Sequence, residues 1–197
     1  MLGSAAVAMW WEVAPEMRAE WEDWHSGEHM PERLAIPGFL RGTRWIAESG
    51  PSYFVCYEVE SLATMTGGAY LQSLNNPTPW SRKMMPHHRN MVRSLCLVRD
   101  GYGGGIAKVI ATVRLSAAVR LPRNKGLTSA HLLESQSMAG APRTTEQKIR
   151  GGDATADWIL LVGGYDLEAV KQASSGVPDG IVGLYRPAYS LSAGEIA

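Results

Sequence analysis

Two histidines four residues apart are the first feature of this sequence that could carry chemistry. They lie in the segment WHSGEHMPERLAIPGF, residues 24–39, in which Glu28 directly precedes the second histidine. The spacing of His25 and His29 would place both on one face of a continuous helix, as in zinc sites of the H-E-x-x-H type. We expect Gly27 to interrupt the helix, Glu28 is at the wrong offset for that motif, and no third ligand is evident. The sequence therefore predicts no metal site.

His29 is the residue of this segment that best suits catalysis. The pattern places it near the end of the first helix, before Pro31, where the helix dipole favours a cation. An unperturbed imidazole titrates near neutral pH, so His29 could act as a general acid or base, oriented by Glu28 or Glu32. The alternative is that the ring only closes the helix by bonding a terminal carbonyl or Glu32. For His25 the alternative is a half-buried side chain beside the tryptophans.

Aromatic and basic side chains around the segment are candidates for a substrate-binding site. Arg33 and Arg44 could hold an anionic or enolate oxygen, although either suits an ion pair with a neighbouring glutamate equally well. The basic run WSRKMMPHHRN, residues 80–90, is either a solvated loop or a segment in which Trp80 closes a pocket and His88 or Arg89 contacts a substrate carboxylate. The aromatic residues pack a core, line a pocket between sheet and helices, or do both. The substrate-binding residues that we predict are Trp24, His25, Arg44, Trp45, Tyr57, Trp80 and His88.

The composition limits the classes of partner. Nineteen basic residues balance nineteen acidic ones, and no run of like charge suggests binding to nucleic acid or to an anionic membrane. No apolar run is long enough to cross a bilayer, and the early run at residues 2–11 lacks the basic start of a signal peptide. Cys56 and Cys96 show no C-x-x-C spacing and suit a reducing compartment. We expect a cytoplasmic protein that binds a small molecule and could also self-associate.

The order of the expected elements predicts two similar halves. Residues 5–13 are typical of a covered strand, and a helical pattern, a strand hairpin around residues 49–52, a second helix near residues 62–74 and a closing strand follow. This is the βαββαβ order of ferredoxin-like folds. The glycine-rich GYGGG, residues 101–105, is the predicted boundary. Beyond it the same order partly recurs, without a counterpart of the first helix.

Each half alone would leave one face of its sheet without helices. Two such units in one chain can bury those faces against each other. We therefore predict an α+β fold in which tandem ferredoxin-like repeats, residues 1–100 and a degenerate 101–197, form one intramolecular barrel with helices outside. The first strand would then separate Cys56 from Cys96, too far apart for a disulfide. Because only the first half has the first helix, we expect any site to lie in the first half, with His29 at the mouth of the barrel.

Two motifs resemble those of an uncharacterised bacterial family of dimeric α+β barrel proteins, often labelled EthD-like. Residues 24–39 resemble the family pattern W-[YH]-x-x-E-H-x-P-E-R-L-x-x-P-G-F, and residues 76–82 resemble N-P-T-P-W-[TS]-R. The resemblance covers the first half and implies the fold but no established reaction. The wider superfamily includes muconolactone isomerases, cofactor-free quinone-forming monooxygenases and haem-dependent chlorite dismutases. In the family pattern tyrosine is common at the position of His25, which argues against an obligatory ligand there.

These observations leave two classes of function open. The first is a cofactor-independent enzyme, of isomerase, monooxygenase or decarboxylase type, which moves protons on a small aromatic or lactone-like metabolite with His29 as acid or base. The second is a non-catalytic module for small-molecule binding or assembly, in which residues 29–33 fix the helix-to-strand turn. Haem binding is a third and weaker hypothesis, since no axial ligand can be singled out. No nucleophile elbow and no nucleotide-binding glycine pattern supports a different class of enzyme.

Overall fold

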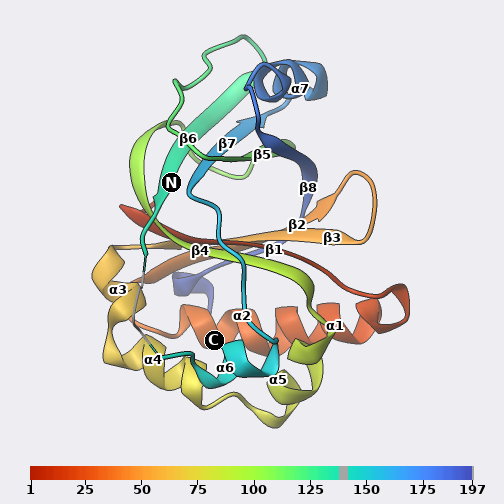
Figure 1. The fold of residues 1–197 in the computed structure, drawn as a ribbon, viewed down its shortest axis with the longest axis vertical. Helices are drawn as coiled ribbons and strands as arrows, with labels where there is room; N and C mark the ends of the chain where they lie inside the picture. The colour runs from red at the N-terminus through yellow and green to blue at the C-terminus, as the bar shows by residue number, and fades with distance from the viewer. Residues whose placement is uncertain (138–141, 197) are drawn as a thin grey trace.

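The computed structural model describes residues 1–137 and 142–196, and its centre is a closed barrel of eight antiparallel strands (Figure 1). The strand order around the barrel is β1-β3-β2-β8-β5-β7-β6-β4. The predicted α+β barrel with helices outside is confirmed. The strands are β1 (Ala5–Glu12), β2 (Phe39–Ala47), β3 (Ser52–Val59), β4 (Arg89–Tyr102), β5 (Val109–Leu115), β6 (Leu127–Ser135), β7 (Trp158–Gly164) and β8 (Ile181–Ser192).

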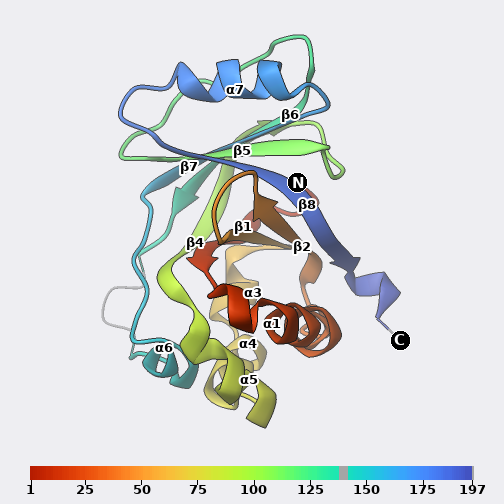
Figure 2. The same ribbon diagram turned by 90° about the vertical axis from the view of Figure 1, so that its right-hand side faces the viewer.

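The helices lie in two groups on opposite sides of the barrel. In Figures 1 and 2 the first six lie below the barrel, against β1 to β4, and α7 alone lies above it, against β5 and β7. No helix within residues 1–137 and 142–196 is long and apolar enough to cross a bilayer. The helices are α1 (Arg18–Trp24), α2 (Met30–Leu34), α3 (Leu62–Thr66), α4 (Gly68–Asn75), α5 (Pro79–Met84), α6 (Thr145–Ile149) and α7 (Leu167–Ser175), with short 3-10 turns at Pro15–Met17, Met85–His87 and Ala193–Glu195.

Alternation along the strands separates the apolar core inside the barrel from two outside it, one against the first six helices and one against α7. On β1, Met9 and Trp11 face the helices, whereas Trp10 faces the barrel interior, because successive side chains of a strand point to opposite faces. The interior is filled by residues from both halves of the chain. Cys56 and Cys96 lie there, unbonded, with β1 between their strands, as predicted.

The first helix continues past Pro31, so the prediction that it stops there is wrong. After α1 the chain makes one π-helical turn, His25–His29, in which the Met30 N–H bonds the His25 carbonyl, and then continues as α2. Pro31 stands at the start of α2. Proline has no N–H to donate, and the wider π turn before it requires no hydrogen bond from this position. Gly27 lies within the π turn and does not interrupt the helix.

Two further helices differ from the expected pattern. The second helix is split at Gly67 into α3 and α4. The run after Thr78 is largely helical rather than a loop, because the Thr78 side chain caps α5 by accepting the Ser81 N–H at 3.0 Å. Helix α6, which we did not predict, begins at a capping box formed by Thr144 and Gln147. Although it belongs to the second half, α6 packs beside α4 under the first half (Figure 2).

Candidate functional site

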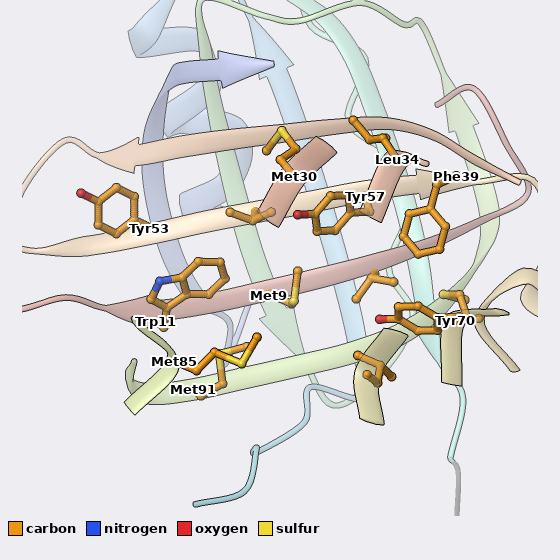
Figure 3. Packing of buried hydrophobic residues seen from close by; sticks show 14 of the residues in the cluster. Met9, Trp11, Met30, Leu34, Phe39, Tyr53, Tyr57, Tyr70, Met85 and Met91 are labelled. Atoms are coloured by element: carbon orange, nitrogen blue, oxygen red, sulfur yellow. The ribbon is translucent and has the colours of Figure 1, made fainter. Parts of the chain in front are cut away.

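A buried cavity lies between the outer face of the sheet and the helices beneath it, and we call it the outer cavity. It spans about 430 Å³, including the part open to solvent. Figure 3 shows part of its apolar wall, with Met9 between Trp11 and Tyr57 on the sheet and Met85 and Met91 below them. The prediction that His29 faces the barrel mouth is wrong, since the helix carrying it packs on the outside. The polar and aromatic lining residues are Trp11, His25, His29, Arg33, Tyr57, Tyr70, His88, Arg93, Glu146 and Arg150.

The π turn brings both histidines of the opening motif to this cavity. The ring centroids of His25 and His29 are 5.7 Å apart. His29 stacks on Trp24 at 4.6 Å, and His25 stacks on Trp21 at 4.9 Å. Single π turns inside α-helices occur often at functional sites, because they shift side chains relative to an α-helical register. Here the shift leaves both imidazoles against the sheet.

His88 is held as a neutral hydrogen-bond donor. The Trp21 indole Nε1 donates to His88 Nε2 at 2.7 Å. An indole nitrogen can only donate, so His88 Nε2 carries no proton and Nδ1 must carry the single one. Burial, followed by the charge of Arg150, lowers the pKa of His88 well below its usual value. The Nδ1–H has no hydrogen-bond partner among the described residues.

His25 is neutral for a similar reason. Its Nδ1 lies 3.5 Å from the Arg44 guanidinium, which donates only, so the proton belongs on Nε2. Burial and then Arg44 lower the pKa of His25 well below its usual value. Arg44 also donates to the Glu22 carbonyl and lies over the ring of Trp21, 5.6 Å from its centroid. Arg44 therefore positions His25 and does not line the outer cavity itself.

His29 differs from the other two because no donor fixes its tautomer. Its side chain is 12% exposed, and its Nδ1 lies 3.9 Å from Glu32 Oε2, beyond hydrogen-bond distance. Burial first, and then Arg33, lower the pKa of His29 well below its usual value, so the expectation of an unperturbed imidazole is wrong. A neutral ring with a free nitrogen lone pair can accept a proton, and Glu32 is close enough to stabilise the imidazolium that would form.

Arginines give the cavity a positive character. The buried guanidinium of Arg33 bonds Glu146 and Ser73 and also lies 3.5 Å from Glu32. Burial lowers the pKa of Arg33, but Glu146 and Glu32 outweigh it and raise the pKa overall, so the group stays charged. Arg93 donates to the Tyr70 hydroxyl at 2.8 Å and has no carboxylate within salt-bridge distance in the described part of the chain.

The second half contributes residues that sequence reasoning missed. Glu146 and Arg150, on and just after α6, line the cavity, and Arg150 bonds Asp153 at 2.9 Å. The expectation that residues of the first half alone form the site is therefore wrong. Thr144 and Gln147 have the spacing of a capping box, which could have indicated a helix start at this point. Nothing in the sequence indicated that Glu146 pairs with Arg33.

Several buried polar atoms around the outer cavity have no partner in residues 1–137 and 142–196. They are Trp11 Nε1, His29 Nδ1, Glu32 Oε2, Tyr57 Oη and His88 Nδ1. Buried polar groups are nearly always hydrogen-bonded, and leaving one unpaired costs about 1–3 kcal/mol. Four of these residues, all but Glu32, line the cavity, which indicates a site that is completed by a ligand or by ordered water.

The remaining predicted residues lie near the site or apart from it. Trp24 is buried under His29, with its Nε1 donating to the Ser81 hydroxyl at 3.2 Å. Glu28 accepts from the Thr78 hydroxyl at 2.5 Å and does not line the cavity. Trp80 is half-buried and donates to Glu20 at 3.3 Å. Trp45 faces the barrel interior, so the structure does not bring it together with His29. Within the described residues no group of three or more His, Cys, Asp or Glu side chains is placed to hold a metal ion.

The fold and the site define a closed α+β barrel with an aromatic-walled, arginine-rich cavity beneath its helices. No protein-family model matches the sequence, and the comparison with curated proteins finds no relative. Among solved structures the chain is similar to an anthrone oxidase-like protein, with a TM-score of 0.61 at 10% identity, over 98% of this chain and 94% of that one.

It is also similar to two candidate monooxygenases. One is from Fusobacterium nucleatum subsp. nucleatum, with a TM-score of 0.54 at 9% identity, over 98% of this chain and 96% of that one. The other is from Lactobacillus acidophilus NCFM, with a TM-score of 0.54 at 8% identity, over 96% of this chain and 97% of that one. At such identities these likenesses establish the shared fold and leave the reaction open.

Proposed function

We propose that this protein is an oxidoreductase for a small phenolic or enolisable aromatic compound, which binds in the outer cavity and loses a proton to His29. The observation that carries the proposal is the state of the three cavity histidines. Two have tautomers fixed by a donor, and only His29 has a ring nitrogen free to accept a proton. Because burial lowers the pKa of His29, it is a base and not an acid at neutral pH.

The proposed reaction forms an anion, and the cavity is suited to hold one. The Trp11 indole N–H and the His88 Nδ1–H are unpartnered donors, and the Tyr57 hydroxyl can donate as well. Donors in place before reaction stabilise a developing oxyanion without the cost of reorganising water. Arg93 adds a positive charge that no carboxylate of residues 1–137 and 142–196 pairs with directly. An anion bound there would also stabilise the imidazolium form of His29, which burial otherwise disfavours.

The oxidant in this proposal is dioxygen, as the names of the similar structures suggest. The space of about 430 Å³ includes the part open to solvent, which favours a substrate of one or two rings over a larger polycyclic one. For 1-naphthol, His29 would take the hydroxyl proton. Dioxygen would then replace the hydrogen on the opposite ring carbon. One oxygen atom becomes the second carbonyl of 1,4-naphthoquinone, and the other leaves as water with both hydrogens, so no external reductant is needed.

Several finer expectations belong to the same proposal. We propose that the chain is an EthD-like member of the dimeric α+β barrel superfamily, that its halves are tandem ferredoxin-like repeats, and that it works in the cytoplasm without a resident cofactor. The strand order supports the repeat, since β4-β1-β3-β2 is followed around the barrel by β8-β5-β7-β6. The small-molecule partner is the phenolic substrate, and self-association of the chain is a further part of the proposal. Binding of nucleic acid or membrane is not expected.

Oxygen consumption in the presence of 1-naphthol tests the proposed function. The wild-type protein should consume oxygen and form quinone. His29→Ala should abolish both while leaving the circular-dichroism spectrum unchanged. Glu28→Gln is the matched control because Glu28 neighbours His29 in sequence but bonds Thr78 outside the cavity. Turnover by His29→Ala at the wild-type rate would refute the assignment of the base.

The alternative function is a non-catalytic binding or assembly module. It is favoured by the structural ties of the motif: His29 stacks on Trp24, and Glu28 joins the π turn to the cap of α5. On this hypothesis His29→Ala chiefly lowers the melting temperature and no turnover of any phenol is found. Oxygen consumption with 1-naphthol and the melting temperature of His29→Ala therefore separate the two functions.

A further inference from the structure

A second cavity lies inside the barrel, on the other face of the same strands, and we call it the inner cavity. It encloses about 510 Å³, including the part open to solvent. Its apolar wall consists of Trp45, Phe54, Ile110 and Leu161. Its mouth is bounded by the chain from Gly104 to Ala107, directly after the boundary glycines noted in the sequence. Its polar residues include Arg41, Glu58, Ser129 and His131.

The two charged side chains among the described residues that line the inner cavity, Arg41 and Glu58, pair with each other. Arg41 donates twice to Glu58 Oε1, at 2.8 and 2.5 Å, and the other oxygen of Glu58 accepts the Leu2 N–H at 2.6 Å. Burial lowers the pKa of His131 to about 4, so its ring is neutral at physiological pH. The amino group of Met1 lies 3.1 Å from His131 Nε2, and burial lowers the pKa of this group as well. The electrostatics therefore contrast with those of the outer cavity.

Two neutral polar groups remain available inside. Trp45 and Ser129 line the cavity, and neither the indole N–H of Trp45 nor the hydroxyl of Ser129 bonds another side chain or backbone group in residues 1–137 and 142–196. Both residues are more than nine-tenths buried. A hydroxyl or carbonyl group of a ligand could pair with both, because an indole donates and a serine hydroxyl donates and accepts. The interior of an eight-stranded barrel is either filled by side chains throughout or holds one small ligand, and here side chains fill part of it.

We propose that the inner cavity is a second ligand-binding site, selective for a small uncharged ring compound that carries a hydroxyl or carbonyl group. Its apolar wall holds the ring, and Trp45 and Ser129 hold the polar group. A carboxylate is disfavoured because Arg41, the cationic side chain of the lining, is already paired with Glu58. The two cavities are separated by the wall of the barrel, in which Cys56 faces in and the adjacent Tyr57 faces out. The proposal does not depend on the reaction proposed for the outer cavity.

Benzyl alcohol and benzoate are a matched pair of probes for this proposal, since they share a ring and differ in charge. Methyl resonances of Ile110 and Leu161 report on the inner cavity. Benzyl alcohol should shift these resonances saturably and give intermolecular NOEs to them in the wild-type protein. Benzoate should leave both resonances in place. Leu161→Trp, which fills the cavity, should weaken the binding of benzyl alcohol at least tenfold, whereas Tyr57→Phe in the outer cavity should not change it.

Each outcome decides for or against the inner site. Unmoved methyl resonances with benzyl alcohol up to its solubility limit would overturn the proposal, and equal shifts with benzoate would overturn the selectivity for uncharged molecules. Loss of binding in Tyr57→Phe but not in Leu161→Trp would move the site to the outer cavity. If Leu161→Trp does not fold, the wild-type NOEs to Ile110 and Leu161 decide the question without it.

Discussion

The protein should lose stability steeply in mild acid, because three buried histidines line the outer cavity in neutral form. Burial lowers the pKa of His25, His29 and His88 well below the value of about 6.5 that histidine has in an unfolded chain. Below that value the unfolded chain takes up protons that the folded protein does not. The stability that these residues contribute is therefore complete above about pH 6.5 and is lost progressively as the pH falls.

The size of the loss follows from this difference in proton binding. Between pH 7.5 and pH 5.5, each histidine that protonates only in the unfolded chain removes about 1.4 kcal/mol from the free energy of unfolding. Three such residues together remove about 4 kcal/mol, which is a large part of the 5–15 kcal/mol typical of a domain. His131, whose pKa is lowered to about 4, adds to the loss in the same direction.

Urea unfolding at pH 7.5, 6.5 and 5.5 measures this prediction directly. His88→Gln should reduce the pH-dependent loss by about one quarter, because one of the four groups is removed. A free energy of unfolding that is the same at pH 7.5 and pH 5.5 would refute the reasoning. It would mean that these histidines protonate inside the folded protein, and His29 would then not be held as a neutral base.

Other substitutions test the packing and charge of the outer cavity. Glu146→Gln should lower the free energy of unfolding by about 3 kcal/mol, because the buried guanidinium of Arg33 loses its main partner and keeps only Glu32 nearby. Adding Arg33→Met should restore part of this loss. If urea unfolding shows that the effects of the two substitutions simply add, the pairing is contradicted. Gly42→Ala should cost about 1–3 kcal/mol in thermal unfolding and weaken binding of 1-naphthol, since a Cβ there would lie 2.8 Å from the ring of Tyr57. Unchanged stability of that variant would show that Tyr57 has room to move.

Much of the fold could be predicted from local patterns. The apolar run around Trp10, the hairpin near Gly50 and the glycines after Asp100 each have a direct physical meaning in strand alternation or turn geometry. Each half has one sheet face without helices, and these two faces can be buried only against each other. The prediction of a barrel follows from this. The path of the first helix could not be predicted, because Gly27 and Pro31 normally end a helix. The π turn that accommodates them depends on packing against the sheet.

The site was predicted less completely than the fold. His25, His29, Tyr57 and His88 were identified because histidine and aromatic side chains suit binding and catalysis, and they do line one cavity. Trp45 was wrongly grouped with them, since the face to which a strand residue points depends on a register that the sequence did not fix. Arg93, Glu146 and Arg150 were missed because their roles arise from contacts between the two halves of the chain.

The central claim is that His29 is the base of the outer cavity, and ¹⁵N NMR of the histidine rings during an anaerobic titration with 1-naphthol tests it most directly. Without oxygen the proposed reaction stops after proton transfer. We predict that His29 is neutral in the free protein and becomes an imidazolium as naphtholate absorbance rises, while His88 stays neutral with its proton on Nδ1. Proton uptake by His88 instead, or naphtholate formation that persists in His29→Ala, would contradict the account.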